Sequence, residues 1–204
     1  MMSETRPQLT YPIRNSLYIN VTNACTAKCS FCPREDKPYV RGYNLRLTLD
    51  PTAEELMAAI DLPSPYEEHV FCGFGEPTLR RTTITTVARW LKEHGATVRL
   101  NTNGHGNLIH KRSIVPDLAA CIDTVSVSLN ATHAYEYNEI MNPAWGKRTF
   151  ESVIEFINEC RNNIPKVIIT AVAFPGFDQS AFRTFVGEQL KLPWRIRAYD
   201  RLGD

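Results

Sequence analysis

Three cysteines stand close together near the start of the chain, and their spacing could hold a metal centre. Cys25, Cys29 and Cys32 form a C-x3-C-x2-C pattern within one short segment. A structural zinc or an electron-carrying 4Fe-4S cluster usually takes four protein ligands, so three thiolates predict a metal cluster with one position left for a substrate or cofactor. From spacing alone, a zinc site completed by His69 or Cys72 is the alternative.

The elements that must position these cysteines alternate along the chain. Alternating and apolar runs predict strands at 16–21, 69–73, 97–102, 124–129, 167–173 and 194–198, with helices at 51–61, 79–94, 111–119, 147–161 and 178–190. Such alternation predicts parallel strands joined by right-handed crossovers. A complete eight-unit barrel typically needs about 250 residues, and the chain has 204. We therefore predict an α/β fold, a partial (βα)6 TIM-like barrel in a single domain of residues 1–204, with 1–14 as an N-terminal extension.

Three consecutive predicted strands deliver polar or Gly-rich loops to one rim of this barrel. The cysteines follow the first strand, residues 73–77 the second and residues 101–104 the third, and sites in such folds collect at the carboxyl ends of strands. On the fourth strand, alternation places Ser126, Ser128 and Asn130 on one face. Polar side chains facing the inside predict a cavity that binds a ligand, whereas local hydrogen bonding of the serines is the alternative.

Composition excludes few partners. The 23 Lys and Arg residues nearly balance the 22 Asp and Glu residues, giving a net charge of +1, so neither nucleic acid nor a membrane surface is indicated. No window approaches the roughly 20 apolar residues of a membrane span, and we expect a cytoplasmic protein. A reducing compartment favours metal binding or free thiols for the six cysteines.

In this order, the motifs resemble those of the radical S-adenosylmethionine (radical SAM) superfamily. Phe31 supplies the aromatic residue before the third cysteine, and Gly-Phe-Gly-Glu-Pro at 73–77 resembles the family's Gly-Gly-Glu-Pro with Phe74 in place of a glycine. The resemblance implies a 4Fe-4S cluster held by Cys25, Cys29 and Cys32, with S-adenosylmethionine on the fourth iron. It further implies reductive cleavage of S-adenosylmethionine to a 5′-deoxyadenosyl radical, which abstracts hydrogen from an unidentified substrate.

The same resemblance implies which residues meet S-adenosylmethionine. Residues 73–77 would approach the methionyl group, although an ordinary strand-to-helix turn is the alternative. Asn-Thr-Asn-Gly at 101–104 resembles the family's Thr-Asn-Gly after the third strand. Polar residues of the fourth strand would meet the ribose and the methionyl carboxylate. Val172 would meet the adenine, although core packing explains Val172 equally well. The full predicted set is Phe31, Gly73, Phe74, Gly75, Glu76, Pro77, Thr102, Asn103, Ser126, Ser128, Asn130 and Val172.

Two groups of basic residues suggest partners. One surrounds the cysteines and could dock an acidic reductase such as flavodoxin or ferredoxin, with solvated surface charge as the alternative. The other group lies near the end of the chain at positions that face the same side of a strand, if the strand continues to the end. It could bind a carboxylate or phosphate of the substrate, although protection of a sheet edge is the favoured interpretation. The first group is Lys28, Arg34, Lys37 and Arg41, and the second is Arg195, Arg197 and Arg201.

Within the superfamily, the sequences of residues 23–34 and 73–78 most resemble radical SAM proteins associated with TatD-family nucleases. This resemblance indicates a genomic neighbour and does not indicate a reaction. A glycyl-radical-enzyme activase and 7-carboxy-7-deazaguanine synthase are enzymatic alternatives, the latter weakened because Pro33 and Arg34 follow the third cysteine. A non-catalytic iron–sulfur or zinc module that carries electrons is the alternative from a different class.

Overall fold

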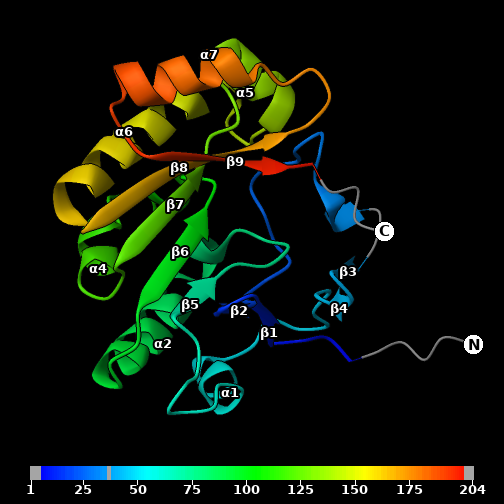
Figure 1. Cartoon of the computed structure of the whole chain (residues 1–204), viewed down its shortest axis with the longest axis vertical. Coiled ribbons are helices and arrows are strands. Elements are labelled where there is room, and N and C mark those ends of the chain that lie inside the picture. The colour runs from blue at the N-terminus through cyan, green and yellow to red at the C-terminus, as the bar shows by residue number, and fades with distance from the viewer. Residues whose placement is uncertain (1–5, 36–37, 200–204) are drawn as a thin grey trace, which may run out of the picture.

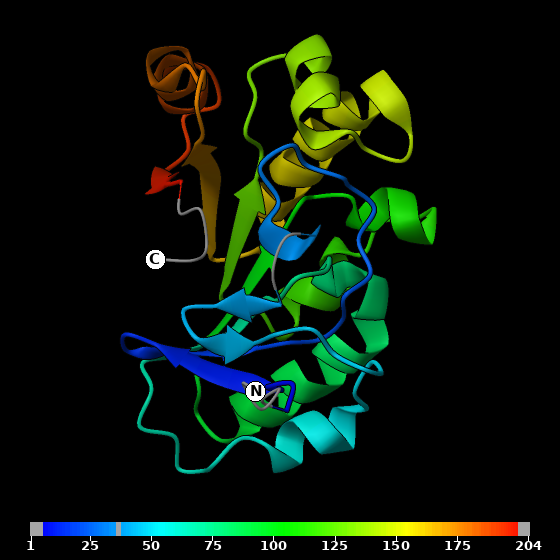
Figure 2. The ribbon, with the colours of Figure 1, turned by 90° about the vertical axis from the view of Figure 1, so that its right-hand side faces the viewer.

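A curved sheet of seven strands forms the centre of the molecule. The structure, a computed structural model, describes residues 6–35 and 38–199. The strands lie in the order β1-β2-β5-β6-β7-β8-β9, and all neighbours pair in parallel except β1 with β2. Within the described residues β1 and β9 are the two open edges, so the sheet is a half-barrel (Figure 2). The strands span Thr10–Ile13, Ser16–Ile19, Glu68–Phe71, Val98–Thr102, Thr124–Ser128, Lys166–Ala173 and Trp194–Ala198.

Helices cover the outer side of this sheet, and the segment that carries the cysteines lies on the other side (Figure 1). That segment also contains a short hairpin of β3 (Tyr39–Val40) and β4 (Tyr43–Asn44). A π-helical turn, Phe185–Gln189, continues the last helix. The helices α1 to α7 span Ala53–Ala58, Arg81–Glu93, Gly106–His110, Val115–Ala119, Ala134–Met141, Thr149–Asn163 and Gln179–Thr184, and 3-10 turns occupy Pro33–Glu35, Pro77–Arg80 and Gly146–Arg148.

Strand alternation divides the sheet into an outer face and an inner face. Val98 and Leu100 of β6 lie in the core beneath the helices, and Val125 and Val127 of β7 do the same. The residues between them point the other way. We call the side that carries Tyr18, Glu68, Arg99, Ser126 and Thr170 the inner face.

The outer layer follows from ordinary helix chemistry. Thr52 caps α1 in a capping box with Glu55. In α2, four buried residues at helical spacing face the sheet, and the chain leaves the helix through Gly95 with a φ of +75°. The four are Ile84, Val87, Ala88 and Leu91.

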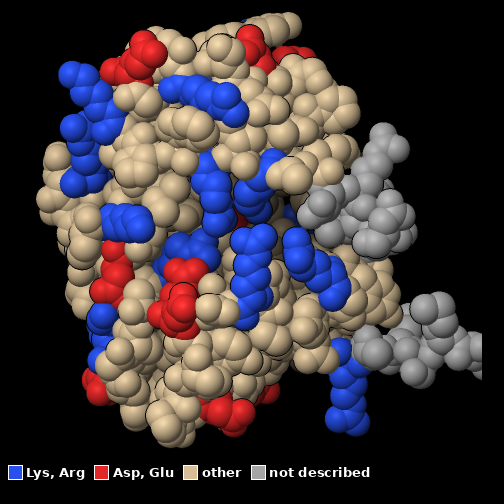
Figure 3. All heavy atoms as spheres, viewed as in Figure 1, with Lys and Arg blue, Asp and Glu red and all other residues tan. Residues whose placement is uncertain are grey.

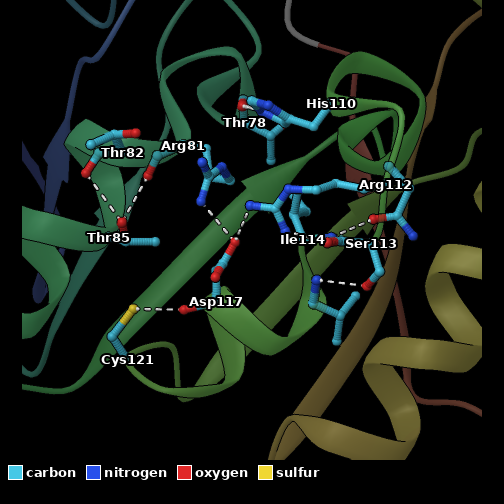
Figure 4. Close-up of polar contacts among 12 residues, drawn as sticks. Thr78, Arg81, Thr82, Thr85, His110, Arg112, Ser113, Ile114, Asp117 and Cys121 are labelled. Carbon is cyan, nitrogen blue, oxygen red and sulfur yellow. Dashed lines mark hydrogen bonds and ion pairs between the residues drawn. The ribbon is translucent and has the colours of Figure 1, made fainter.

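Polar contacts fix the crossover between β6 and β7. Asp117 of α4 accepts hydrogen bonds from Arg81 at the start of α2 and from Arg112, at 2.7 and 2.9 Å. His110 of α3 contacts the Thr78 carbonyl at 2.8 Å. Figure 4 shows these side chains meeting between the three helices. The loop that follows β6 is thereby held against the loop that follows β5.

The structure departs from the predicted elements in several places, among them the unpredicted α3 and the β3–β4 hairpin. Residues 10–13, predicted as part of an extension, form β1 at the edge of the sheet, paired with β2 through a tight turn at Arg14 with a φ of +53°. Pro12 within that run obscured the strand, although proline is tolerated on an edge strand. Helix α5 was not predicted, because its apolar pattern is short. Six strands run parallel as expected, but no helix follows β9 within the described residues.

Among the described helices, none is long and apolar enough to cross a membrane.

Candidate active site at the carboxyl edge of the sheet

The segment that carries Cys25, Cys29 and Cys32, here called the cysteine loop, follows β2 and is held by backbone hydrogen bonds. The Lys28 amide donates to the Met141 carbonyl at 3.1 Å, and the Ser30 amide donates to the Ile140 carbonyl at 2.9 Å, so the loop rests on the end of α5. Within the loop, the Cys32 amide donates to the Cys29 carbonyl at 3.0 Å. All three predicted ligand cysteines are partly exposed free thiols.

The three thiols lie near enough to one another to interact electrostatically. Burial raises the pKa of Cys29 to about 12, and the neighbouring Cys25 and Cys32 act in the same direction. Burial also raises the pKa of Cys25, with smaller effects from Glu76 and Cys32 among the causes. A bound cation would reverse this effect because it stabilises the thiolate form.

The second loop, residues 73–77, packs directly on the backbone that leads into the cysteines. The Gly75 amide donates to the Thr22 carbonyl at 2.9 Å, and the Glu76 amide donates to the Ala24 carbonyl at 2.8 Å. A Cβ at Gly75 would lie 2.3 Å from the Ala24 oxygen, and one at Gly73 would lie 2.3 Å from Oδ1 of Asn20. Both glycines are therefore required by contacts between protein segments.

Glu76 connects the second loop to the third. Its Oε1 accepts from the Thr78 amide at 3.0 Å, the Thr78 hydroxyl at 2.6 Å and the Thr102 hydroxyl at 2.7 Å. Its Oε2 accepts from the Asn103 amide at 2.7 Å. Burial raises the pKa of Glu76, and these hydrogen bonds oppose that effect. Pro77 follows as the first residue of the 3-10 turn.

A chain of hydrogen bonds runs from the cysteines into the protein. The Asn103 side-chain amide lies 3.8 Å from Sγ of Cys25 and 3.3 Å from the Thr26 hydroxyl. That hydroxyl lies 2.8 Å from Nδ1 of His105, whose Nε2 lies 2.7 Å from the Tyr137 hydroxyl. Burial lowers the pKa of His105 to about 3, so the ring is neutral.

Thr26, His105 and Tyr137 were not identified from the sequence. Thr26 and His105 adjoin predicted motifs, but a threonine or histidine next to a motif does not by itself indicate a role in the site. Only the fold shows that Tyr137, on the unpredicted α5, reaches the same place.

The predicted polar residues on and just after the fourth parallel strand, β7, make different contacts. Ser128 is partly buried on the inner face, and its hydroxyl lies 3.3 Å from that of Thr170 on β8. Ser126 lies two residues earlier on the same face and is buried. Asn130 is buried with a φ of +58°, and its Oδ1 accepts from the Val172 amide at 2.9 Å. Asn130 thus fixes the backbone between β7 and β8.

Two aromatic residues of the predicted set point in different directions. Phe31 stacks on Phe174, which follows β8, with ring centroids 5.2 Å apart and an angle of 10° between the planes. This contact brings the cysteine loop next to the strand end that carries Val172. Phe74 instead belongs to a small apolar cluster with Tyr11 and Leu45. It also lines a cavity of about 420 Å³ together with Asn23, Arg34 and Arg46.

The structure argues against His69 as a fourth ligand. His69 of β5 is buried, and neither ring nitrogen has a hydrogen-bond partner among the described residues. Its neighbour Glu68 faces inward to Arg99, so alternation turns His69 toward the helices. Cys72 lies beside Tyr11. Among the described residues, no group of three or more His, Cys, Asp and Glu side chains is arranged to hold a metal ion.

The donor set nevertheless fits a 4Fe-4S cluster with an open position. Three thiols from one loop are the ligand type that such clusters take, and the loops after β5 and β6 lie against that loop. Phe31, Asn103 and Ser128 border the same edge of the sheet. These residues could hold the cluster and a nucleoside ligand side by side.

The basic residues predicted to bind partners lie in different surroundings. Lys28 is exposed, whereas Arg34 packs on the loop with its guanidinium 3.4 Å from the Asn23 carbonyl. Arg41 is exposed in the turn between β3 and β4. Arg195 and Arg197 lie on β9. Lys37 and Arg201 lie outside the described residues.

Comparisons with known proteins identify the family of the chain. The model of the radical SAM superfamily matches residues 19–187. A protein of Methanocaldococcus jannaschii assigned as a glycyl-radical enzyme activating enzyme is 26% identical over 158 residues, covering 75% of this chain and 59% of that protein. GTP 3′,8-cyclase of Peptoclostridium acidaminophilum is 26% identical over 175 residues, covering 84% of this chain and 50% of that enzyme. The chain spans about half the length of the curated relatives it matches.

Solved structures share the fold. Streptococcus suis SuiB bound to S-adenosylmethionine has a TM-score of 0.65 and 21% identity, with 91% of this chain and 41% of that chain covered. A radical SAM methyltransferase from Sphaerobacter thermophilus has a TM-score of 0.62 and 18% identity, with 93% of this chain and 57% of that chain covered. Because the family model spans most of the chain, including the cysteine loop, this protein belongs to the radical SAM superfamily, whose enzymes use a 4Fe-4S cluster and S-adenosylmethionine.

Proposed function

We propose that the chain is the catalytic core of a radical SAM enzyme that cleaves S-adenosylmethionine and abstracts hydrogen from a substrate. The observation that carries the proposal is that Cys25, Cys29 and Cys32 lie on one loop, which contacts the loops after β5 and β6. The 4Fe-4S cluster, when bound through these thiolates, supplies the electron that splits S-adenosylmethionine into methionine and a 5′-deoxyadenosyl radical.

The chain's own residues position and protect the reactants in this proposal. The second loop offers main-chain carbonyls to the methionyl ammonium, while Glu76 keeps that loop joined to Asn103. Ser126 and Ser128 present hydroxyls on the inner face, and Phe31 with Val172 borders the adenine. Orientation of this kind is the protein's main contribution when the cofactor performs the chemistry.

Cluster assembly tests the proposal directly. Anaerobically reconstituted protein should contain about four iron and four sulfide per chain and should form 5′-deoxyadenosine from S-adenosylmethionine and dithionite. Cys29→Ala should abolish both the cluster absorbance and this product, because two thiolates do not retain the cluster.

Cys121→Ala is the matched control. Cys121 is buried, and its thiol lies 3.5 Å from the Asp117 carbonyl, away from the cysteine loop. This variant should keep wild-type iron content and product formation. A wild-type protein that binds one zinc per chain, or a Cys29→Ala variant that still forms 5′-deoxyadenosine, would contradict the proposal.

The relatives suggest candidate substrates without choosing among them. One is assigned as an activase of glycyl-radical enzymes and another is a GTP 3′,8-cyclase, at the same 26% identity. A peptide glycine and a nucleotide are thus both candidates. Deuterated candidate substrates, followed by the appearance of deuterium in 5′-deoxyadenosine, would identify the correct class.

Two partners complete the proposal. An acidic reductase such as flavodoxin or ferredoxin would deliver the electron near Lys28, which is exposed beside the cysteines. A functional link to a TatD-family nuclease rests on the local sequence runs at 23–34 and 73–78 alone. Lys28→Glu should slow reduction of the cluster by flavodoxin and leave dithionite reduction unchanged. Equal effects on both reductants would exclude docking there.

A further inference from the structure

Two arginines on the edge strand β9 have no hydrogen-bond or ion-pair partner among residues 6–35 and 38–199. Arg195 and Arg197 are exposed, and neither forms a hydrogen bond or ion pair with another residue in the described part of the chain. Other arginines in the molecule do find partners. Arg81 pairs with Asp117 and Arg99 pairs with Glu68, both at 2.7 Å. The two β9 side chains therefore keep their full donor capacity.

Register places both side chains on the inner face. Arg195 pairs with Thr170 of β8, and Arg197 pairs with Val172. Thr170 faces inward, because its hydroxyl lies beside that of Ser128. Ile196, between the arginines, packs against the outer core. Paired residues in adjacent strands point to the same face of a sheet, so both guanidinium groups point toward the inner face.

The inner face carries an excess of positive charge at this point. Arg99 of β6 is buried and forms two hydrogen bonds with Glu68, at 3.0 and 2.7 Å. Partial burial lowers the pKa of Arg195, and the nearby charges of Arg99 and Arg197 add to that effect. Within the described part of the chain, the carboxylate whose charge acts on Arg195 is that of Glu68, which is already hydrogen-bonded to Arg99. Figure 3 shows several Lys and Arg side chains in the middle of the molecule as viewed in Figure 1, with Asp and Glu side chains beside them.

Three arginines that share the single described carboxylate of Glu68 repel one another, which raises the free energy of the protein, and a bound anion reduces that repulsion. Side chains two residues apart on a strand are separated by about 6.6 Å at the backbone. Two long guanidinium groups at this spacing can converge on one anion, and each can donate two parallel hydrogen bonds to an oxyanion.

We propose that Arg195 and Arg197 bind an oxyanion of the substrate, a phosphate or a carboxylate group, on the inner face beside the end of β8. The proposal rests on the proposed function, because it places the substrate next to the S-adenosylmethionine site. It assigns the substrate class as an anionic small molecule or an anionic group on a larger one. Arg197 is level with Val172, so the anion is held close to the adenosyl group and anchors the remainder of the substrate there.

Anion binding can be measured without knowing the substrate. Anaerobically reconstituted protein is titrated at low ionic strength in an isothermal calorimeter. Sodium pyrophosphate is the probe for the phosphate class, and succinate, in a separate titration, is the probe for the carboxylate class. At least one probe should bind, and the tighter one identifies the phosphate or carboxylate class. Arg195→Gln and Arg197→Gln should each weaken that probe about tenfold or more, as expected for loss of a hydrogen bond to a charged group.

Control variants separate a specific site from general charge. Arg89→Gln removes the same charge from the exposed surface of α2 and should leave affinity unchanged. Arg197→Lys keeps the charge but loses the forked donors, and it should bind with intermediate affinity. The absence of binding to the wild type, or equal weakening by Arg89→Gln, would overturn the proposal.

Three further readouts exclude other roles. Circular dichroism should show that the Gln variants remain folded. The affinity for S-adenosylmethionine should not change, since an equal loss would mean that the arginines hold the cofactor's carboxylate. Self-association should not increase, since an increase with unchanged anion affinity would show that the arginines protect the sheet edge.

If anion binding is found but no 5′-deoxyadenosine forms, the proposed function fails and the anion site stands. The reverse result rejects the anion site alone.

Discussion

At the scale of single residues, Glu76 organises the site through hydrogen bonds within the protein. Its carboxylate accepts four hydrogen bonds from Thr78, Thr102 and Asn103. Both oxygens are therefore occupied by donors of the chain itself. The side chain positions the two loops, and in the proposed function the main chain of the second loop meets the cofactor.

Glu76→Gln tests this positioning role. The amide group would turn a donor toward either the Asn103 amide or the Thr78 and Thr102 hydroxyls, so at least one buried donor loses its acceptor. We expect the free energy of unfolding, measured by urea denaturation, to fall by about 2 kcal/mol. S-adenosylmethionine affinity should fall as well, because the loops separate.

The control for this substitution is Glu139→Gln. Glu139 is an exposed residue of α5, and surface changes of this kind usually alter stability by less than about 0.5 kcal/mol. Equal stability of Glu76→Gln and Glu139→Gln would show that the four hydrogen bonds contribute nothing.

At the scale of elements, the close approach of the second loop to the cysteine loop depends on Gly75. In Gly75→Ala the new methyl group would lie 2.3 Å from the Ala24 oxygen and 2.5 Å from the Thr22 oxygen. Both are backbone atoms that cannot rotate away. We expect a loss of about 1–3 kcal/mol in the free energy of unfolding, the usual cost of overpacking, together with reduced iron incorporation on reconstitution.

Gly187→Ala is the comparison for Gly75→Ala. Gly187 lies in the π-helical turn after α7, and a Cβ there would be 3.4 Å from Trp194. Alanine is the better helix former, so stability should stay the same or rise. Wild-type iron content in Gly75→Ala would contradict a tight contact between the two loops.

At the scale of the whole molecule, His105 joins the cysteine loop to α5 as a buried neutral ring. Its pKa of about 3 in the folded protein lies below its ordinary value of 6.5. The unfolded chain therefore binds a proton between these values that the folded chain does not bind. Stability is fully present above pH 6.5 and is lost as the pH falls toward 3.

This linkage predicts an acid sensitivity that a substitution removes. Between pH 7.5 and 5.5, the wild type should lose about 1.4 kcal/mol more free energy of unfolding than His105→Gln, as calculated for one histidine with an unfolded pKa of 6.5. Urea denaturation of both proteins at the two pH values measures the difference. Burial also lowers the pKa of His69, but that effect is common to both proteins and cancels. Equal losses would show that His105 accepts a proton in the folded state.

The sequence by itself determined the order of the elements and the loops that carry chemistry. The strand predicted at 194–198 is β9 with the same bounds, and the predicted inward orientation of Ser126 and Ser128 agrees with the structure. Periodicity is a local property, so it can be read without knowing the fold. The cysteine spacing and the Gly-rich loop are local in the same sense.

Only the tertiary structure decided which side chains meet. Phe74 stands within a predicted cofactor motif, yet its ring packs with Tyr11 and Leu45. Arg195 and Arg197 were interpreted from the sequence as edge protection, and only the register with β8 and the position of Arg99 show that they share an inner face with excess positive charge. Contacts between residues far apart in the chain depend on sheet curvature and register, and these are set by the packing of the whole core and not by any short segment.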